Sequence, residues 1–264
     1  MKGFVAIIFI LVLFFCSCQK VVNLNLNTVP PQIVIQGEIT DSAGPYSITI
    51  NQSVDFYASN TFPAISGAVV KISDNLGNSD SLIEYTPGIY STTNFLGRPG
   101  RTYTLSVTAQ NKTYTAVSSM PMPVKLDSVT FEITSGFGIQ RINAIANFQD
   151  PPGIPNYYQF LEYINGKQFN KEIFILDDRL SDGKYISTTL RTDSSYINMG
   201  DVVKLKMYSI DENVYNYFLQ LRQSSGTGAF NSTASPANPT TNISGGALGY
   251  FSAHTTQFQT VTVN

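Results

Sequence analysis

The stretch IVIQGEITDSAGPYSITI, residues 33–50, contains two short runs in which apolar and polar residues alternate. The apolar residues on one side of these runs are Ile33, Ile35 and Ile39, followed by Tyr46, Ile48 and Ile50. A period of two residues is typical of a β-strand that buries one of its faces. The stretch therefore predicts two successive strands.

Similar runs continue along the first half of the chain. Residues 68–85 hold two of them around the turn-forming Asp74–Asn78, and residues 102–120 read as a hairpin around Gln110–Lys112. Asn and Gly at these turns separate the strands. About seven short strands in about 95 residues match a β-sandwich. We therefore predict an immunoglobulin-like sandwich over residues 32–121.

The second half of the chain also has strand patterns. Prolines cluster in MPMPVKLDSV, and we place a domain boundary near Pro121–Lys125. The later runs are YYQFLEYING, KQFNKEIFIL, YISTTLRT and VVKLKMYSID. These runs alternate or are rich in β-formers, so residues 125–264 are predicted to form a second β-rich domain. The fold class is all-β.

One helix is expected, over Asp211–Gln223. Its apolar residues recur at i, i+3, i+4 and i+7, and they are Val214, Tyr217, Phe218 and Leu221. This spacing places them on one face of an α-helix. Either Asp211 alone, or Ser209 together with Glu212, supplies the N-terminal cap. Residues 224–246 are mostly small and uncharged and are predicted to form a long loop.

The beginning of the chain, MKGFVAIIFILVLFFCSCQK, is a targeting signal. Lys2 precedes an apolar run from Phe4 to Phe15, which is shorter than the roughly 20 residues that a membrane-spanning helix needs. Small Ser17 stands before Cys18, which resembles a bacterial lipobox. We predict that residues 1–17 are a signal peptide and that Cys18 is acylated. A plain signal peptide and a short membrane anchor are the alternatives.

Acylation of Cys18 has chemical consequences. Residues 18–31 become a lipidated tether with a first strand, and the mature chain keeps no free thiol because the chain has only two cysteines. Thiol catalysis and cysteine-ligated metals are then excluded. Several acyl chains give stable membrane anchoring. By resemblance to lipoprotein sorting, Gln19 after the cysteine favours the outer membrane, with the periplasmic or external face left open.

Composition narrows the class of partner. Charged residues make up 13% of the chain and the net charge is −2, which offers no electrostatic footprint for nucleic acid. Abundant Ser, Thr, Asn and Tyr are typical of an extracytoplasmic β-protein.

The order of motifs resembles a family of Bacteroidota lipoproteins known as domain of unknown function 4249. The motifs that carry the resemblance are IVIQGEITDSAGPYSITI, SGAVVKISDNLGN, PGIYSTTNFLGRPGRTYTLSV, LDDRLSDGK, DENVYNYFLQL and NPTTNISGGALGYFSA. The resemblance covers nearly the whole chain. It implies an outer-membrane lipoprotein associated with a TonB-dependent transporter, without an assigned activity. The family often has acidic residues after the cysteine, where this chain has Asn23, Asn25 and Asn27.

Catalytic chemistry has few candidates. His254 is the only histidine, and Ser252 is the nearest nucleophile, but the chain has no G-x-S-x-G motif to place a serine. We expect His254 to be a polar strand residue. No pair of carboxylates is selected by spacing for a glycosidase. We expect no enzyme, no cofactor and no metal.

Acidic residues crowd one turn before Gly183. Asp177, Asp178 and Asp182 provide oxygen ligands of the kind that calcium prefers, but their spacing fits no calcium loop. We expect an acidic turn paired with Arg179 or Lys184, and whether it binds an ion stays open.

Two aromatic pairs follow loops. Tyr157 and Tyr158 follow a proline-rich loop, and Tyr250 and Phe251 follow the glycine-rich one. Core packing explains one residue of each pair, and the other is either solvent-facing or part of a binding interface. Three functions remain: a binding or accessory lipoprotein beside a transporter, a structural or adhesive spacer, and a hydrolase with an unrecognised site. The first is the function we predict.

Overall fold

The computed structural model describes residues 30–55, 61–136, 139–169, 172–191, 197–224 and 238–264. The predicted signal peptide, Cys18 and most of the tether lie outside these residues. Residues Pro31–Asn264 form one compact unit. No helix within the described residues is long and apolar enough to cross a membrane.

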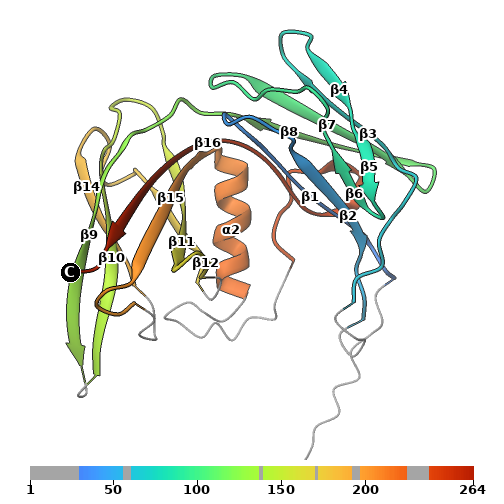
Figure 1. The fold of residues 1–264 in the computed structure, drawn as a ribbon. Coiled ribbons are helices and arrows are strands. Elements are labelled where there is room, and N and C mark those ends of the chain that lie inside the picture. Colours follow the sequence, from blue (N-terminus) through green and yellow to red (C-terminus); the bar gives the residue numbers. More distant parts are fainter. Residues whose placement is uncertain (1–29, 56–60, 137–138, 170–171, 192–196, 225–237) are drawn as a thin grey trace, which may run out of the picture. The chain divides into compact units, whose positions relative to one another are not determined.

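The described residues form three β-sheets and one α-helix, so the predicted all-β class is confirmed (Figure 1). The strands of the first half are β1 (Ile33–Thr40), β2 (Ser47–Gln52), β3 (Val69–Asp74), β4 (Ser79–Ser81), β5 (Ile83–Thr86), β6 (Ile89–Ser91), β7 (Thr102–Ala109) and β8 (Lys112–Ser119). Those of the second half are β9 (Leu126–Gly136), β10 (Ile139–Gln149), β11 (Tyr157–Ile164), β12 (Lys167–Gln168), β13 (Phe174–Asp177), β14 (Tyr185–Leu190), β15 (Val202–Ile210) and β16 (Leu248–Thr262).

Strand β16 joins the two halves of the chain. Its residues Leu248–His254 pair in parallel with β1, and Thr255–Thr262 pair antiparallel with β15. The resulting nine-stranded sheet has the order β12-β11-β15-β16-β1-β2-β6-β5, with β13 also paired to β11. The other sheets are β14-β10-β9 and β4-β3-β7-β8. In Figure 1, β16 runs from β1 across to β15.

Apolar side chains form three clusters. The first contains residues of β1–β3 and β6–β8 and also takes in Ile243, Ala247, Phe251 and Ala253 from the end of the chain. The second contains residues of β9–β11 and β14–β16, and the third surrounds the helix. The domain boundary predicted near Pro121–Lys125 does not account for the residues at the end of the chain that pack in the first cluster. Whether residues 32–121 and 125–264 are separate domains stays a prediction.

The helix is α2 (Glu212–Ser224), one residue from the predicted position at each end. Asp211 is its cap: Oδ1 accepts a hydrogen bond of 2.9 Å from the Val214 N–H. The apolar face packs inward as the periodicity predicts, with Val214 and Phe218 buried, while Asn213 is exposed. A short 3₁₀ helix, η1 (Ser244–Gly246), precedes β16, and residues 225–237 of the predicted loop lie outside the described part.

Candidate functional site

Three neighbouring strands, β2, β1 and β16, have one apolar and one polar face. Successive side chains of a strand point to opposite faces. The residues that enter the first cluster are Ile33, Ile35 and Ile39 of β1, Ile48 and Ile50 of β2, and Phe251 and Ala253 of β16. The opposite face carries Gln36, Glu38, Thr40, Ser47, Thr49, Tyr250, Ser252 and His254. The register places Tyr250, Ser252 and His254 of β16 beside Gln36, Glu38 and Thr40 of β1. Polar groups from both ends of the sequence therefore meet on one surface.

A cleft of about 410 Å³ opens on this polar face. Residues that line it include Gln36, Glu38, Thr40, Tyr46, Thr49 and Tyr250. The lining contains one carboxylate, that of Glu38, and no lysine or arginine. Its volume lies in the lower part of the range of small-molecule sites, about 300–1,000 Å³. The cleft suits a small ligand or a single side chain.

Tyr46 holds one wall of the cleft in place. Its hydroxyl lies 2.8 Å from the Thr40 carbonyl oxygen and 2.6 Å from that of Ser42, and it accepts a hydrogen bond of 3.0 Å from the Gly97 N–H. Burial, supported by the negative charge of Asp41, raises the pKa of Tyr46. The hydroxyl therefore stays protonated and keeps the segment between β1 and β2 fixed.

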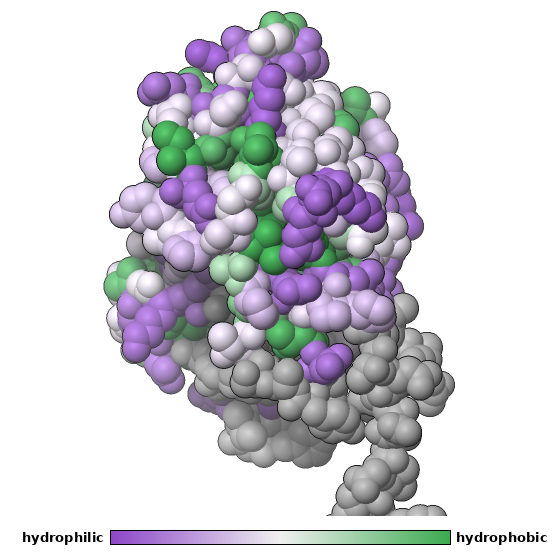
Figure 2. All heavy atoms as spheres, turned by 90° about the vertical axis from the view of Figure 1, so that its right-hand side faces the viewer, coloured by the Kyte–Doolittle hydropathy of each residue, from purple (hydrophilic) through white to green (hydrophobic). Residues whose placement is uncertain are grey.

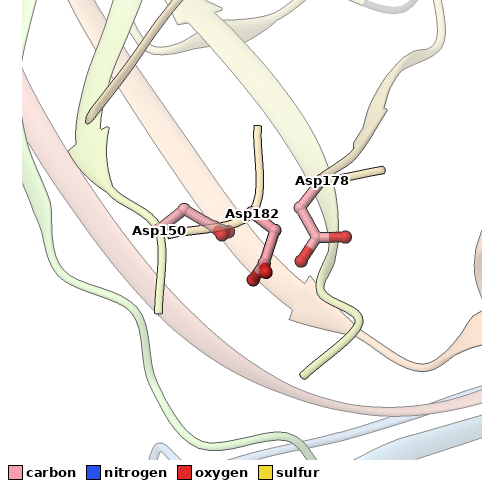
Figure 3. A group of neighbouring side chains, drawn as sticks. All are labelled: Asp150, Asp178 and Asp182. Carbon is pink, nitrogen blue, oxygen red and sulfur yellow. The ribbon is translucent and has the colours of Figure 1, made fainter. Parts of the chain in front are cut away.

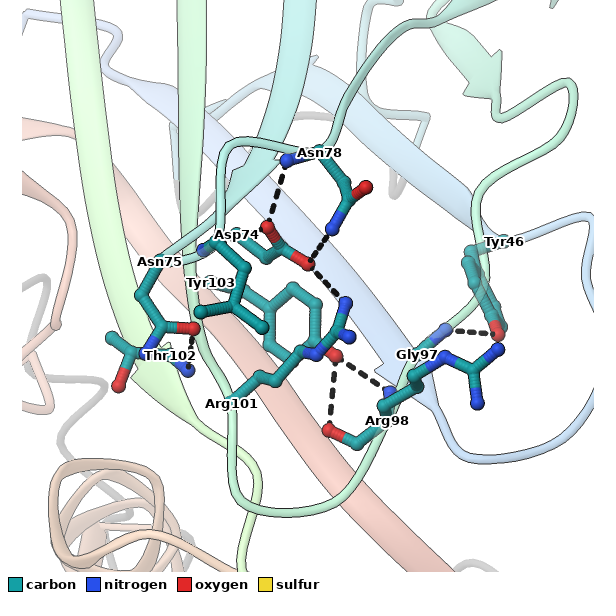
Figure 4. A network of polar contacts seen from close by, with 10 residues as sticks. Tyr46, Asp74, Asn75, Asn78, Gly97, Arg98, Arg101, Thr102 and Tyr103 are labelled. Atoms are coloured by element: carbon teal, nitrogen blue, oxygen red, sulfur yellow. Dashed lines mark hydrogen bonds and ion pairs between the residues drawn. The ribbon is translucent and has the colours of Figure 1, made fainter.

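The segment that carries Gly97 is fixed in turn by a polar network (Figure 4). The Tyr103 hydroxyl accepts a 2.6 Å hydrogen bond from the Arg98 N–H, and Arg101 forms a 2.5 Å ion pair with Asp74. Burial acts to raise the pKa of Asp74, but hydrogen bonds from Asn78, Leu76 and Arg101 outweigh it and hold that pKa below its usual value. Asp74 therefore remains a carboxylate that anchors this side of the site.

Glu38 and Tyr250 meet inside the cleft. The Tyr250 hydroxyl donates a hydrogen bond of 2.9 Å to Oε1 of Glu38. The Tyr250 ring packs against Tyr217 and Phe218 of α2, with ring centroids 5.1 and 4.9 Å away. Burial and the nearby charge of Glu38 raise the pKa of Tyr250, so its hydroxyl remains a donor. The helix therefore positions this hydrogen bond.

His254 lies on the same sheet face and is buried, with its ring stacked on Tyr208 at 4.1 Å. Nδ1 is 3.0 Å from Oγ of Ser252, and Nε2 has no hydrogen-bond partner within the described part of the chain. Burial lowers the pKa of His254, against the opposing negative charges of Glu38 and Asp41. The imidazole is therefore neutral near pH 7. The strand position predicted for His254 is confirmed.

The Ser252–His254 contact brings together the pair that the sequence singled out. A serine nucleophile needs an acid on the second imidazole nitrogen and access for substrate. Ser252 is 2% exposed, and Nε2 meets no acid among the described residues. The pair thus lacks two features of a serine hydrolase.

The four aromatic residues proposed for binding loops lie in strands β11 and β16. Tyr158 and Phe251 are fully buried, as expected for one residue of each pair. Tyr157 is partly buried and its ring packs against Tyr215 at 5.0 Å. Tyr250 alone of the four lines the cleft, and a binding role for these residues stays a prediction.

The predicted acidic turn pairs with arginine, as expected. Oδ1 and Oδ2 of Asp177 accept hydrogen bonds of 3.0 and 2.8 Å from Arg179, and Oδ2 also accepts one of 2.7 Å from the Tyr215 hydroxyl. The hydrogen bond from Arg179 is the main cause that holds the pKa of Asp177 below its usual range.

The other two acids of the turn, Asp178 and Asp182, join Asp150, which the sequence analysis missed (Figure 3). One carboxylate oxygen of each lies within 4.8 Å of the others. Asp150 accepts from the Tyr158 hydroxyl and the Gly183 N–H, at 2.5 and 3.0 Å. Asp178 and Asp182 accept from backbone N–H groups of residues 156 and 153, at 2.8 and 2.7 Å. These bonds fasten the loop after β10 to the turn after β13.

The first half of the chain also has exposed apolar side chains. They include Val69 on β3, Ile83 and Tyr85 on β5 and Ile89 on β6. Figure 2 shows the side with these strands, where hydrophobic areas are separated by hydrophilic ones. Scattered apolar residues are ordinary on protein surfaces. The cleft is therefore the stronger candidate site.

Sequence reasoning missed Glu38 and Tyr46. Glu38 stands at a polar position of an alternating strand, which is a signal of a solvent-facing side chain and not of a site. Its partner Tyr250 is 212 positions away, so no local pattern links them.

No curated protein matches this chain. One family model matches residues 19–260. The match begins at the residue after Cys18 and ends at Thr260 of β16, which pairs with Lys204 of β15. All residues that line the cleft lie within the match. The chain therefore belongs to the family described as domain of unknown function DUF4249.

Proposed function

We propose that this protein is a non-enzymatic lipoprotein of the outer membrane that binds a ligand in the cleft beside Glu38, as an accessory to a TonB-dependent transporter. The cleft on the polar face of β2, β1 and β16 is the observation that carries the proposal. Lipobox-like residues before Cys18 and the family resemblance support the membrane anchor and the transporter.

The cleft has the properties of a preformed recognition site. Glu38 and Tyr250 are held by the sheet and by α2, and Tyr46 is held by three polar contacts. Polar groups that are fixed before binding lose little conformational entropy when a ligand arrives. A few convergent polar groups with aromatic neighbours are typical of ligand sites.

Two measurements test the proposal. The tagged full chain is purified from detergent-solubilised outer membranes, where we expect a transporter to co-purify. Melting temperatures are then measured with pooled glycans and peptides for the wild type, for Thr49→Phe, which fills the cleft, and for Thr260→Phe, an exposed control on β16. We expect the shift in melting temperature to vanish only in Thr49→Phe.

The opposite result favours the spacer. If the chain purifies alone and no pool shifts its melting temperature, the accessory role loses its support. A structural or adhesive protein then takes its place.

A hydrolase is the second candidate, and the 3.0 Å contact between Ser252 and His254 is the observation that favours it. A fluorophosphonate probe tests it, because an activated serine reacts with such probes. We expect no labelling. Labelling that disappears in Ser252→Ala would overturn the non-enzymatic proposal.

A further inference from the structure

We infer that the cleft takes an organic cation, an alkylammonium or guanidinium group, with the Glu38 carboxylate as its counter-ion. This inference rests on the proposed function, since it names the class of ligand for the same cleft.

The charge of the cleft is unbalanced. Glu38 is the only charged side chain in the lining. Its one hydrogen bond within the described residues comes from the neutral Tyr250 hydroxyl. No described lysine or arginine lies within 4.0 Å of its carboxylate. A partly buried carboxylate is costly without a cation, so a positively charged ligand group would offset that cost.

Charged groups near the cleft add to this imbalance. Asp41 follows β1 directly and accepts a 3.0 Å hydrogen bond from the Thr256 N–H. Burial is the main cause that lowers the pKa of His254, the negative charges of Glu38 and Asp41 act to raise it, and the positive charge of Lys206 acts with burial. Nζ of Lys206 lies 5.1 Å from the centre of the Tyr163 ring. Two carboxylates therefore give this face a negative potential, which disfavours an anionic ligand.

The chemistry of the cleft walls also favours an organic cation. The side chain of Tyr250 stands on the polar face and lines the cleft, whereas the Tyr46 ring is buried in the first apolar cluster. A tyrosine ring attracts ammonium and guanidinium groups through its quadrupole, and carboxylates bind them through charge-assisted hydrogen bonds. One carboxylate beside one tyrosine ring suits an organic cation better than a bare metal ion, which takes several oxygen ligands.

A neutral sugar is the competing ligand, because Glu38, Gln36 and Thr49 also accept or donate hydrogen bonds. Glu38→Gln separates the two classes. Glutamine has the size and hydrogen-bonding capacity of the original side chain but no charge. A cation should lose most of its affinity for this variant, while a sugar should lose little.

The experiment measures binding to the full lipidated chain in neutral detergent, by calorimetry at low salt. The probes are butylammonium, butylguanidinium, uncharged butanol, glucose and the peptide Gly-Lys-Gly. We expect both butyl cations to bind, butanol and glucose not to bind, and Glu38→Gln to weaken the cations by about 10- to 100-fold, the value of one charge-assisted hydrogen bond. Asp55→Asn, an exposed acid outside the cleft lining, should change nothing.

Peptide and free amine identify the source of the cation. Tighter binding of Gly-Lys-Gly than of butylammonium indicates a lysine side chain of a partner protein, and the reverse indicates a free amine.

Binding of glucose or butanol that Glu38→Gln leaves intact overturns the inference of a cationic ligand but keeps a ligand-binding cleft. If no cation binds, the inference is wrong, and the pooled-ligand and co-purification results decide separately whether the proposed function stands. Glu38→Asp, which keeps the charge, should retain cation binding and guards against a folding defect of the glutamine variant.

Discussion

The Tyr250 hydroxyl donates a 2.9 Å hydrogen bond to Glu38, although the two residues are 212 positions apart in the chain. The parallel pairing of β1 with β16 brings them together, since this register sets Tyr250 beside Gln36 and Ser252 beside Glu38. Within the described residues, β16 therefore completes a site whose other residues come from β1, β2 and the segment between them.

The pairing of β1 with β16 depends on Gly249. Its φ is +97°, and a Cβ there would lie 2.0 Å from the Ile35 carbonyl oxygen. We expect Gly249→Ala to lower the free energy of unfolding by about 3–5 kcal/mol, because the backbone of β1 blocks the added methyl group. Urea denaturation measures this loss, and Gly200→Ala serves as the control variant. Gly200 has a φ of +87° with nothing within 4 Å, so its variant should lose only about 1–2 kcal/mol. Equal losses would contradict the steric explanation.

Asp211 ties α2 to the first half of the chain. Besides capping the helix, its Oδ2 accepts hydrogen bonds from the Ser118 hydroxyl and, at 3.1 Å, from the Ser119 N–H. We expect Asp211→Ala to lower the free energy of unfolding by about 2–3 kcal/mol, because a cap and two further hydrogen bonds are lost. Asn213→Ala, at an exposed position of the same helix, should stay within about 0.5 kcal/mol. Urea unfolding followed by circular dichroism measures both, and similar effects would count against the tie.

Glu162 should make stability depend on pH. It is 2% exposed, Oε1 has no hydrogen-bond partner within the described part, and burial raises its pKa from 4.5 to about 7. Between these two pKa values the folded chain holds a proton that the unfolded chain has lost. Its contribution to stability is therefore complete below pH 4.5 and is lost as the pH rises to about 7.

The test of this pH dependence is Glu162→Gln, which cannot titrate. Relative to the wild type, we expect the variant to gain about 3 kcal/mol in free energy of unfolding between pH 4.5 and pH 8. Denaturation at several pH values measures the gain, with Asp55→Asn as an exposed control. A difference between variant and wild type that stays constant with pH would show that Glu162 titrates normally.

Acylation of Cys18 is the prediction from the first residues. Labelled palmitate should enter the wild type and Cys16→Ser but not Cys18→Ser, because Ser17 is small enough for the position before the cleavage site and Phe15 is bulky. Labelling is read from the immunoprecipitated chain. If Cys16→Ser abolishes it and Cys18→Ser does not, the assignment is wrong.

Local patterns were sufficient for the elements of this fold. Alternation predicted the strands at Ile33–Thr40 and Ser47–Gln52, and a spacing of three and four residues predicted α2 with Asp211 as its cap. These signals are local because the period of a strand or helix is visible within a short stretch of neighbouring side chains. The pairing of Asp177 with Arg179 could be predicted for the same reason.

Tertiary structure alone decided which strands meet. The run ALGYFSAHTTQFQTVTV, residues 247–263, indicates one or two closing strands, but not that residues 248–254 join β1 and residues 255–262 join β15. Asp150 likewise reaches Asp178 and Asp182 only through the folded loop, and Glu38 reaches Tyr250 only through the sheet register. Register is selected by the burial of whole faces among residues far apart in the chain. The sequence by itself thus determined the strands, the helix and the polar face of each strand, whereas packing determined that three of those faces form one cleft.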